Sequence, residues 1–294
     1  MAQNQTIFVN QKLVFLGNTK EKYDLVDLLR SEAMLLGKGT FGSSYKAELE
    51  NGKIVFVKRL KDCCLVQEEF NKKIQELAQL SNHHESLLPL RAYYYSKDEK
   101  LLVFDYIPMS SLASLLHING ETKRSQLTWK VRTQIAYGVA RGLEFLHAQG
   151  PSVCHGNIRS SNVLLTNSFD ARLSDHGLFR LFMSNPTLSL NGVISTVVGY
   201  AYDISKNQMF TALVSYAIDK NKGIDLPSWV RIMFQEKPII DVFDKNMVQN
   251  YQEFGDQMVQ LLELAICCTF KNPTKRPSII AVANQIKRTC NFKS

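Results

Sequence analysis

The chain has 294 residues, 45% of them hydrophobic, and its 16 Phe and 11 Tyr exclude a disordered protein. The net charge of +8 comes from Lys and Arg interspersed with Asp and Glu, so we expect a solvated basic surface and no nucleic-acid partner. No segment approaches the roughly 18 consecutive apolar residues of a membrane span. We therefore expect any membrane anchor to lie outside this chain.

The six cysteines indicate a reducing compartment. No C-x-x-C motif occurs, and Cys63–Cys64 and Cys267–Cys268 are adjacent pairs. This pattern suits neither a disulfide framework nor a zinc site, so we expect a cytosolic environment.

The beginning of the chain predicts a lead-in followed by a β-hairpin. Residues 1–23 are weakly patterned, and Asp24 is placed to cap a short helix after them. Asn51-Gly52 separates two strand-like runs, 44–49 and 54–59. This pair predicts a hairpin, because both of its residues can take positive φ.

Apolar spacing then predicts a small sheet with one helix, followed by a mostly helical half. Strands are predicted over 87–95 and 101–106, and later helices from Thr128 and over 258–266 and 279–286. The helix between the hairpin and the next strand is predicted from five apolar residues at spacings of three and four: Val66, Phe70, Ile74, Leu77 and Leu80.

A glycine-rich loop and a lysine indicate a phosphate-binding site. Gly37-Lys38-Gly39-Thr40-Phe41-Gly42 has the spacing G-x-G-x-x-G, and glycines let the backbone approach phosphate groups closely. The motif lies between strands rather than before a helix, which disfavours a Rossmann site. Lys58 ends a strand sixteen residues later, at the distance of a lysine that pairs with phosphates.

Three later motifs carry a resemblance to a known family. His155 to Asn162 has the length and ends of H-R-D-x-x-x-x-N, Asp175-His176-Gly177 takes the place of D-F-G, and Lys275-Arg276-Pro277 is similar to a late kinase motif. From about Leu13 to Arg288 the chain resembles plant leucine-rich-repeat receptor-like kinases. It is most similar to the group with pollen receptor-like kinases and receptor kinases designated inactive.

The resemblance implies an α+β, bilobal protein-kinase-like fold. It divides the chain into the lead-in 1–30, which is juxtamembrane-like, a β-rich N-lobe over 31–106 and a mainly helical C-lobe over 107–294. It implies an ATP site and two magnesium ligands, Asn162 and Asp175, whose oxygens suit Mg²⁺. The implied nucleotide-binding residues are Gly37, Gly39, Gly42, Lys58, Asp105 and Ile107.

Several positions depart from a working kinase. Asn157 stands where the family has the aspartate base, so a contribution of roughly 10²–10⁴-fold to the rate is lost. Gly156 replaces the neighbouring arginine. Phe56 stands where the family has an alanine beside adenine, and its ring either obstructs the nucleotide site or rotates into the lobe core.

The helical partner of Lys58 is ambiguous. Alignment with the family places Lys73 where an active kinase has a glutamate, and a shift of one turn would offer Glu76 instead. His176 replaces the phenylalanine of D-F-G, and we assign it no role.

The largest departure is a shortening after the activation segment. The family continues after Gly199-Tyr200 with Ala-Pro-Glu and a long apolar helix, whereas this chain reads Ala201-Tyr202-Asp203-Ile204. We predict an internal deletion around 201–222. Arg276, whose family partner is the missing glutamate, is expected to be solvated or paired with an acid such as Asp203.

These departures predict a pseudokinase that acts as a non-catalytic signalling or scaffold module and requires no cofactor. Its expected partners are other receptor kinases or cytoplasmic signalling proteins, on the cytosolic side of the plasma membrane. Two alternatives remain. One is a weakly active Ser/Thr kinase that uses ATP and Mg²⁺, because phosphoryl transfer depends largely on positioning and electrostatics. The other is a decayed product that folds poorly.

Overall fold

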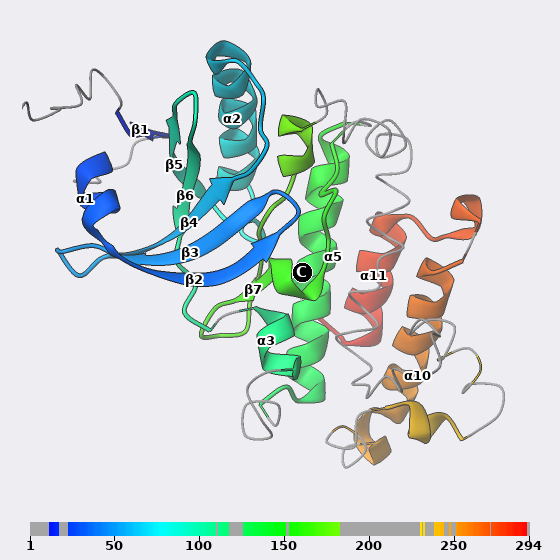
Figure 1. The fold of residues 1–294 in the computed structure, drawn as a ribbon. Helices are drawn as coiled ribbons and strands as arrows, with labels where there is room; N and C mark the ends of the chain where they lie inside the picture. The colour runs from blue at the N-terminus through cyan, green and yellow to red at the C-terminus, as the bar shows by residue number, and fades with distance from the viewer. Residues whose placement is uncertain are drawn as a thin grey trace, which may run out of the picture. The chain divides into compact units, whose positions relative to one another are not determined.

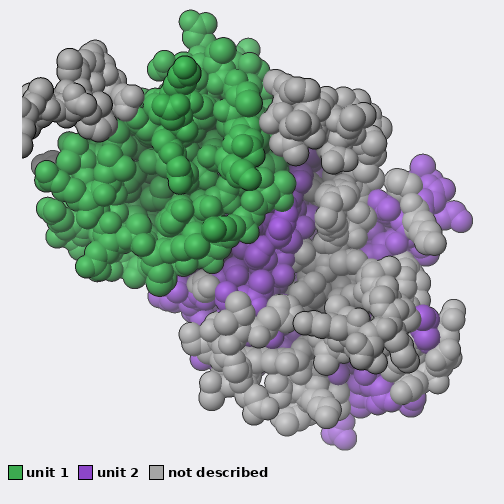
Figure 2. Space-filling model, viewed as in Figure 1, with its two compact units in different colours: residues 1–83, 88–106, 178–189 green, residues 84–87, 107–177, 190–294 purple. Residues whose placement is uncertain are grey.

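The computed structural model describes residues 12–17, 23–109, 111–117, 126–150, 153–182, 230, 232, 238–243, 247, 251–270 and 272–292 (Figure 1). The chain forms two compact units, coloured separately in Figure 2. Unit 1 comprises residues 1–83, 88–106 and 178–189, and unit 2 comprises residues 84–87, 107–177 and 190–294. The boundaries expected from the sequence stay a prediction, and residues 178–189 join unit 1 from beyond its expected end.

Unit 1 is built on a six-stranded antiparallel sheet with the strand order β1-β5-β6-β4-β3-β2. Alternation along the strands gives the sheet two different faces. The strands are β1 (Val14–Phe15), β2 (Glu32–Gly39), β3 (Gly42–Glu48), β4 (Ile54–Leu60), β5 (Leu90–Tyr95) and β6 (Lys100–Asp105).

One face packs under the short helix α1 (Leu25–Arg30). Leu28 of this helix joins Val55, Val57 and Val103 in a buried apolar cluster. The predicted cap is confirmed, because the Asp24 carboxylate accepts from the backbone N–H groups of Val26 and Asp27.

The other face carries α2 (Gln67–Asn82). The centroid of its Phe70 ring lies 5.8 Å from that of Tyr93 and 5.2 Å from that of Tyr95, both on β5. The predicted helix is confirmed. Val66, which the predicted helical spacing included, precedes the first helical turn and is 66% exposed.

The hairpin between β3 and β4 is confirmed, and only one residue of the Asn51-Gly52 pair has positive φ. The Leu49 N–H donates to the Lys53 carbonyl at 2.8 Å, so three residues form the loop. Gly52 has a φ of +79°, whereas Asn51 is not among the residues with positive φ. A three-residue loop places only its last residue in the left-handed region, which explains why one glycine is sufficient.

Unit 2 is organised around the long helix α5 (Trp129–Ala148). The Thr128 hydroxyl accepts from the Val131 N–H, as expected of the predicted helix start. Gly142 lets the helix approach the neighbouring hairpin, since a Cβ there would lie 2.9 Å from a Leu173 methyl carbon. The other elements of this unit are α3 (Leu112–His117), η1 (Ser160–Asn162), β7 (Val163–Leu165), β8 (Ala171–Leu173), η3 (Ile239–Val242), α10 (Tyr251–Cys268), η4 (Pro273–Lys275) and α11 (Ile279–Thr289).

Side-chain contacts join the helices of unit 2. The Trp129 indole N–H donates to Oε1 of Gln257 at 3.0 Å, which ties α5 to α10. The Tyr137 ring of α5 stacks on Phe292, just beyond α11, at 4.8 Å between centroids. Among the helices that the structure describes, none has the length and apolar character to span a membrane.

Candidate functional site

The predicted site residues fall on both units. Unit 1 carries Asp105, Lys58 and the three motif glycines, and unit 2 carries Ile107 with the catalytic-loop and Asp-His-Gly residues. The residues of each unit are described separately below.

The third glycine of the glycine-rich loop has a structural role within the sheet. The loop is a tight turn between β2 and β3, with Thr40 and Phe41 at its tip. Gly42 has a φ of +140°, and a Cβ there would lie 2.0 Å from the Arg59 carbonyl oxygen. By contrast, a Cβ on Gly37 would meet nothing within 4 Å. The close approach of β4 therefore explains Gly42 without any phosphate.

Phe56 and Lys58 lie on the face of the sheet away from the apolar cluster of Val55 and Val57, because side chains alternate along β4. Phe56 is directly opposite Phe104 of β6, and the ring centroids are 5.8 Å apart. Both rings are buried, as is Lys58, which is only 3% exposed. A large aromatic pair thus shares its sheet face with the predicted phosphate lysine.

Asp105, predicted to contact the nucleotide, forms an ion pair. The Arg91 guanidinium donates to both oxygens of this carboxylate, at 3.0 Å from Nε and 2.6 Å from Nη2 to Oδ2. The hydrogen bonds from Arg91 to Asp105 raise the pKa of the arginine above its usual range. Ile107 is half-buried in unit 2.

Both candidate partners of Lys58 on α2 are engaged by Arg180. The Lys73 amine donates to the Arg180 carbonyl at 2.9 Å and pairs with Glu69 at 3.0 Å. The Glu76 carboxylate accepts from the Arg180 guanidinium at 2.8 Å. The pairing of Lys58 with either residue stays a prediction.

The catalytic-loop residues of unit 2 converge on Asn157, whose amide contacts Asp175. The Asn157 amide donates from Nδ2 to Oδ2 of Asp175 at 3.4 Å, and Arg159 donates from Nε to the Asn157 amide oxygen at 3.0 Å. The Asn162 amide donates to the Asn157 carbonyl at 2.7 Å. Asp175 is buried with a φ of +63°. His176 is also buried, and its Nδ1 lies 3.3 Å from the Leu173 carbonyl oxygen.

The predicted magnesium ligand Asp175 already accepts a side-chain N–H, and its assignment to Mg²⁺ together with Asn162 stays a prediction. Mg²⁺ prefers an octahedron of oxygen ligands, usually with one or two carboxylates. Here the carboxylate of Asp175 receives an N–H from Asn157, and the Arg159 guanidinium lies on the other side of the same amide. The Asn157 amide therefore donates a hydrogen bond to the Asp175 carboxylate, and Arg159 holds this amide in place.

The variant Asn157→Asp is expected to lose about 1–2 kcal/mol of stability in the absence of divalent cations, because a carboxylate would face Asp175 in place of a donor. The retained contact with Arg159 limits the loss. Added Mg²⁺ is expected to restore the unfolding midpoint of this variant and to leave the wild type unchanged. Thermal unfolding with and without millimolar MgCl₂ measures both effects. Equal responses of the two proteins to Mg²⁺ would contradict the role of the Asn157 amide as the donor that faces Asp175.

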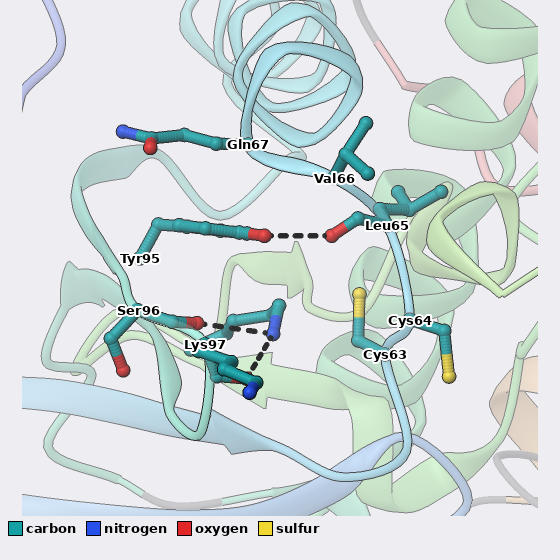
Figure 3. Close-up of a pocket in the computed structure, with 9 residues that line it drawn as sticks. Cys63, Cys64, Leu65, Val66, Gln67, Tyr95, Ser96 and Lys97 are labelled. Carbon is teal, nitrogen blue, oxygen red and sulfur yellow. Dashed lines mark hydrogen bonds between the residues drawn. The ribbon is translucent and has the colours of Figure 1, made fainter.

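A separate cavity of about 640 Å³ lies at the start of α2 in unit 1 (Figure 3). The Tyr95 hydroxyl donates to the Leu65 carbonyl at 2.9 Å along it, and the Lys100 amine donates to the Ser96 carbonyl at 3.2 Å. Burial raises the pKa of the Cys63 thiol above its usual range. None of the residues predicted to bind nucleotide lines this cavity.

Sequence reasoning missed Arg159, Arg180 and Phe182. Arg159 lies inside the motif that begins at His155. Its charge, two residues after Asn157, could have predicted a contact with the Asn157 side chain. Arg180 and Phe182 follow Asp-His-Gly, where no pattern indicates their partners on α2 and the glycine-rich loop.

The predicted deletion around 201–222 and Asp203 lie outside the described residues. Arg276 is described, and its Nε donates to the Phe270 carbonyl at 2.7 Å. A backbone oxygen therefore takes at least one of the hydrogen bonds expected for an acidic partner.

Comparison with known proteins identifies the family. Residues 31–212 match the family model for protein tyrosine and serine/threonine kinases. The chain is 42% identical over 293 residues to the probable inactive receptor kinase RLK902 of Arabidopsis thaliana, covering 94% of this chain and 45% of the relative. Another probable inactive receptor kinase from the same plant is 41% identical, over 94% of this chain and 44% of the relative. The chain thus spans a little under half the length of these relatives.

Two solved structures share the fold. The pseudokinase domain of BIR2, an immune regulator of the RLK/Pelle family, aligns with a TM-score of 0.78 at 27% identity, covering 97% of this chain and 90% of that one. The kinase domain of maize SIRK1 bound to AMP-PNP aligns with a TM-score of 0.73 at 26% identity, over 94% and 99% of the two chains. These likenesses confirm the predicted α+β kinase-like fold, with a β-sheet N-lobe and a helical C-lobe. The chain belongs to the protein tyrosine and serine/threonine kinase family, as a kinase domain of the plant leucine-rich-repeat receptor-like type.

Proposed function

We propose that this domain is a pseudokinase that acts as a non-catalytic signalling or scaffold module. The observation that carries the proposal is the amide of Asn157 at the position of the catalytic base. Its Nδ2 donates to Asp175 and its Oδ1 accepts from Arg159, so both ends of the amide are occupied by neighbouring side chains. An amide has no useful basicity and does not take the proton of a substrate hydroxyl.

The nucleotide half of the site supports the same proposal. The Phe56 ring packs on Phe104, on the sheet face that carries Lys58. Adenine would have to share this space with a buried phenyl ring, and overpacking of a filled site is unfavourable. We therefore infer that neither ATP nor Mg²⁺ is required for the domain to fold and function.

For partners, we infer other receptor kinases or cytoplasmic signalling proteins, on the cytosolic side of the plasma membrane. Support comes from the similarity to the pseudokinase domain of an immune regulator and to probable inactive receptor kinases. A domain without phosphoryl transfer can still act by binding, since function resides in surfaces and sites rather than in the fold.

The alternative, weak Ser/Thr kinase activity, is favoured by one observation. Lys58 and Asp175 are both retained and buried, and Asn162 lies next to the backbone of Asn157. Phosphoryl transfer relies mainly on positioning and electrostatics, so these groups keep part of what a kinase needs.

A phosphorylation assay separates the two functions. The chain is incubated with ATP and either Mg²⁺ or Mn²⁺, and phosphate incorporation into itself and into a generic protein substrate is measured by mass spectrometry. The Lys58→Met variant, checked for folding by its unfolding midpoint, sets the background. We expect the wild type to match this background. Incorporation above it that depends on Lys58 would overturn the proposal in favour of the weak kinase.

A further inference from the structure

Residues 178–182, directly after Asp-His-Gly, are held by three separate parts of unit 1. They include the short helix η2 (Leu178–Leu181) and Phe182. Their contacts reach the tip of the glycine-rich loop, the segment between β4 and α2, and α2 itself. All of these residues belong to the same compact unit, although they are far apart in the sequence.

The apolar contact joins the glycine-rich loop to Phe182. Phe41, at the tip of the loop, stacks on Phe182 with the ring centroids 5.1 Å apart and an interplanar angle of 20°. Both rings are buried, with 7% and 3% of their surface exposed. A phenyl ring at the tip of a surface turn would lose this burial if Phe182 moved away. The Phe41 carbonyl also accepts from the Lys61 N–H at 3.1 Å, which fixes the backbone of the tip.

Polar contacts join the same segment to α2 and to the segment before it. Arg180 is held at both ends, because its guanidinium donates to Glu76 at 2.8 Å and its carbonyl accepts from the Lys73 amine at 2.9 Å. The Cys63 thiol lies 3.7 Å from the Leu181 carbonyl oxygen. These contacts fix the segment two residues before Phe182 and so orient its ring.

We propose that residues 178–182 form a clasp that holds the glycine-rich loop in place without a nucleotide. A ligand that needs the loop to move must first separate Phe41 from Phe182. The clasp goes beyond the proposed scaffold function. It concerns how strongly the glycine-rich loop is held when neither nucleotide nor partner is bound. Arg180 is a positioning residue within it, and Phe182 makes the contact with the loop.

The relative strength of the contacts predicts a ranking of variants. The side chains of the Glu76–Arg180 pair are 38% and 26% exposed, and partly exposed ion pairs contribute little by themselves. The buried aromatic stack contributes more, through both burial and ring geometry. Loss of Phe182 should therefore release the loop strongly. Loss of the Arg180 guanidinium should release it weakly, although this group does not contact the loop.

Hydrogen exchange of the full chain, without nucleotide, tests the clasp. The readout is the exchange rate of the peptide that spans the β2–β3 turn. Phe182→Ala is expected to raise this rate about tenfold or more, and Arg180→Gln about two- to threefold. Phe182→Leu keeps apolar bulk without the ring, so it should fold normally and give an intermediate increase.

Two control variants remove similar contacts elsewhere. Phe292→Ala removes the ring that stacks on Tyr137 in unit 2, and Arg141→Gln removes an ion pair with Glu144 on α5. Both should leave exchange at the β2–β3 turn unchanged. The clasp is overturned if Phe182→Ala and Phe182→Leu stay within twofold of the wild type. It is equally overturned if the control variants raise exchange at this turn as much as the clasp variants do.

Discussion

Replacement of Phe56 by alanine is expected to lower the free energy of unfolding by about 3–5 kcal/mol, the usual cost of truncating a buried phenyl ring. Phe56 is 8% exposed and faces the ring of Phe104 across the β4–β6 ladder. Truncation removes this aromatic contact and leaves a cavity beside the second ring. Denaturant unfolding measures the loss, and Phe56→Leu, which retains most of the apolar volume, should lose clearly less.

The same variant separates obstruction by Phe56 from other causes of weak nucleotide binding. If the ring blocks adenine, ATP and Mg²⁺ should raise the unfolding midpoint of Phe56→Ala and leave that of the wild type unchanged. A variant that loses stability and remains unresponsive to nucleotide would show that Phe56 only fills the core. A loss below about 1 kcal/mol would contradict the packing described for this ring.

Replacement of Gly42 by alanine is expected to cost about 3 kcal/mol or more. Two causes add: a φ of +140° is strained for any residue with a side chain, and the new methyl group would lie 2.0 Å from the Arg59 carbonyl oxygen. The β3–β4 ladder must shift to relieve the clash. Thermal unfolding of the variant measures the effect.

The chain supplies matched controls within the same motif. A Cβ on Gly37 would meet nothing within 4 Å, and one on Gly39 only the Gly42 carbonyl oxygen at 3.9 Å. Gly37→Ala and Gly39→Ala should therefore change stability by no more than about 0.5 kcal/mol. If all three variants lost similar stability, the separate structural role of Gly42 would be wrong.

Local signals in the sequence predicted local structure well. Asp24 and Thr128 cap helices as their side-chain chemistry requires, and Asn51-Gly52 marks a true hairpin. The errors are also local. Val66 fits the helical spacing but precedes the first turn, and only Gly52 of the Asn51-Gly52 pair has positive φ.

The site was less predictable, because its contacts join residues far apart in the chain. Motif spacing brought Asn157, Asn162 and Asp175 together correctly in one loop cluster. It gave no sign that Arg180 would engage Glu76, 104 residues earlier. Nor did it indicate that Phe182 would stack on Phe41, since aromatic contacts between distant segments leave no periodic pattern.

The central claim is that this kinase domain folds and works without nucleotide. The most direct test is the unfolding midpoint of the purified chain with and without millimolar ATP and Mg²⁺. A ligand at one hundred times its dissociation constant would stabilise the folded state by about 2.7 kcal/mol, a readily measured shift. We predict one cooperative transition with an unchanged midpoint. A clear increase that depends on both ATP and Mg²⁺ would contradict the account.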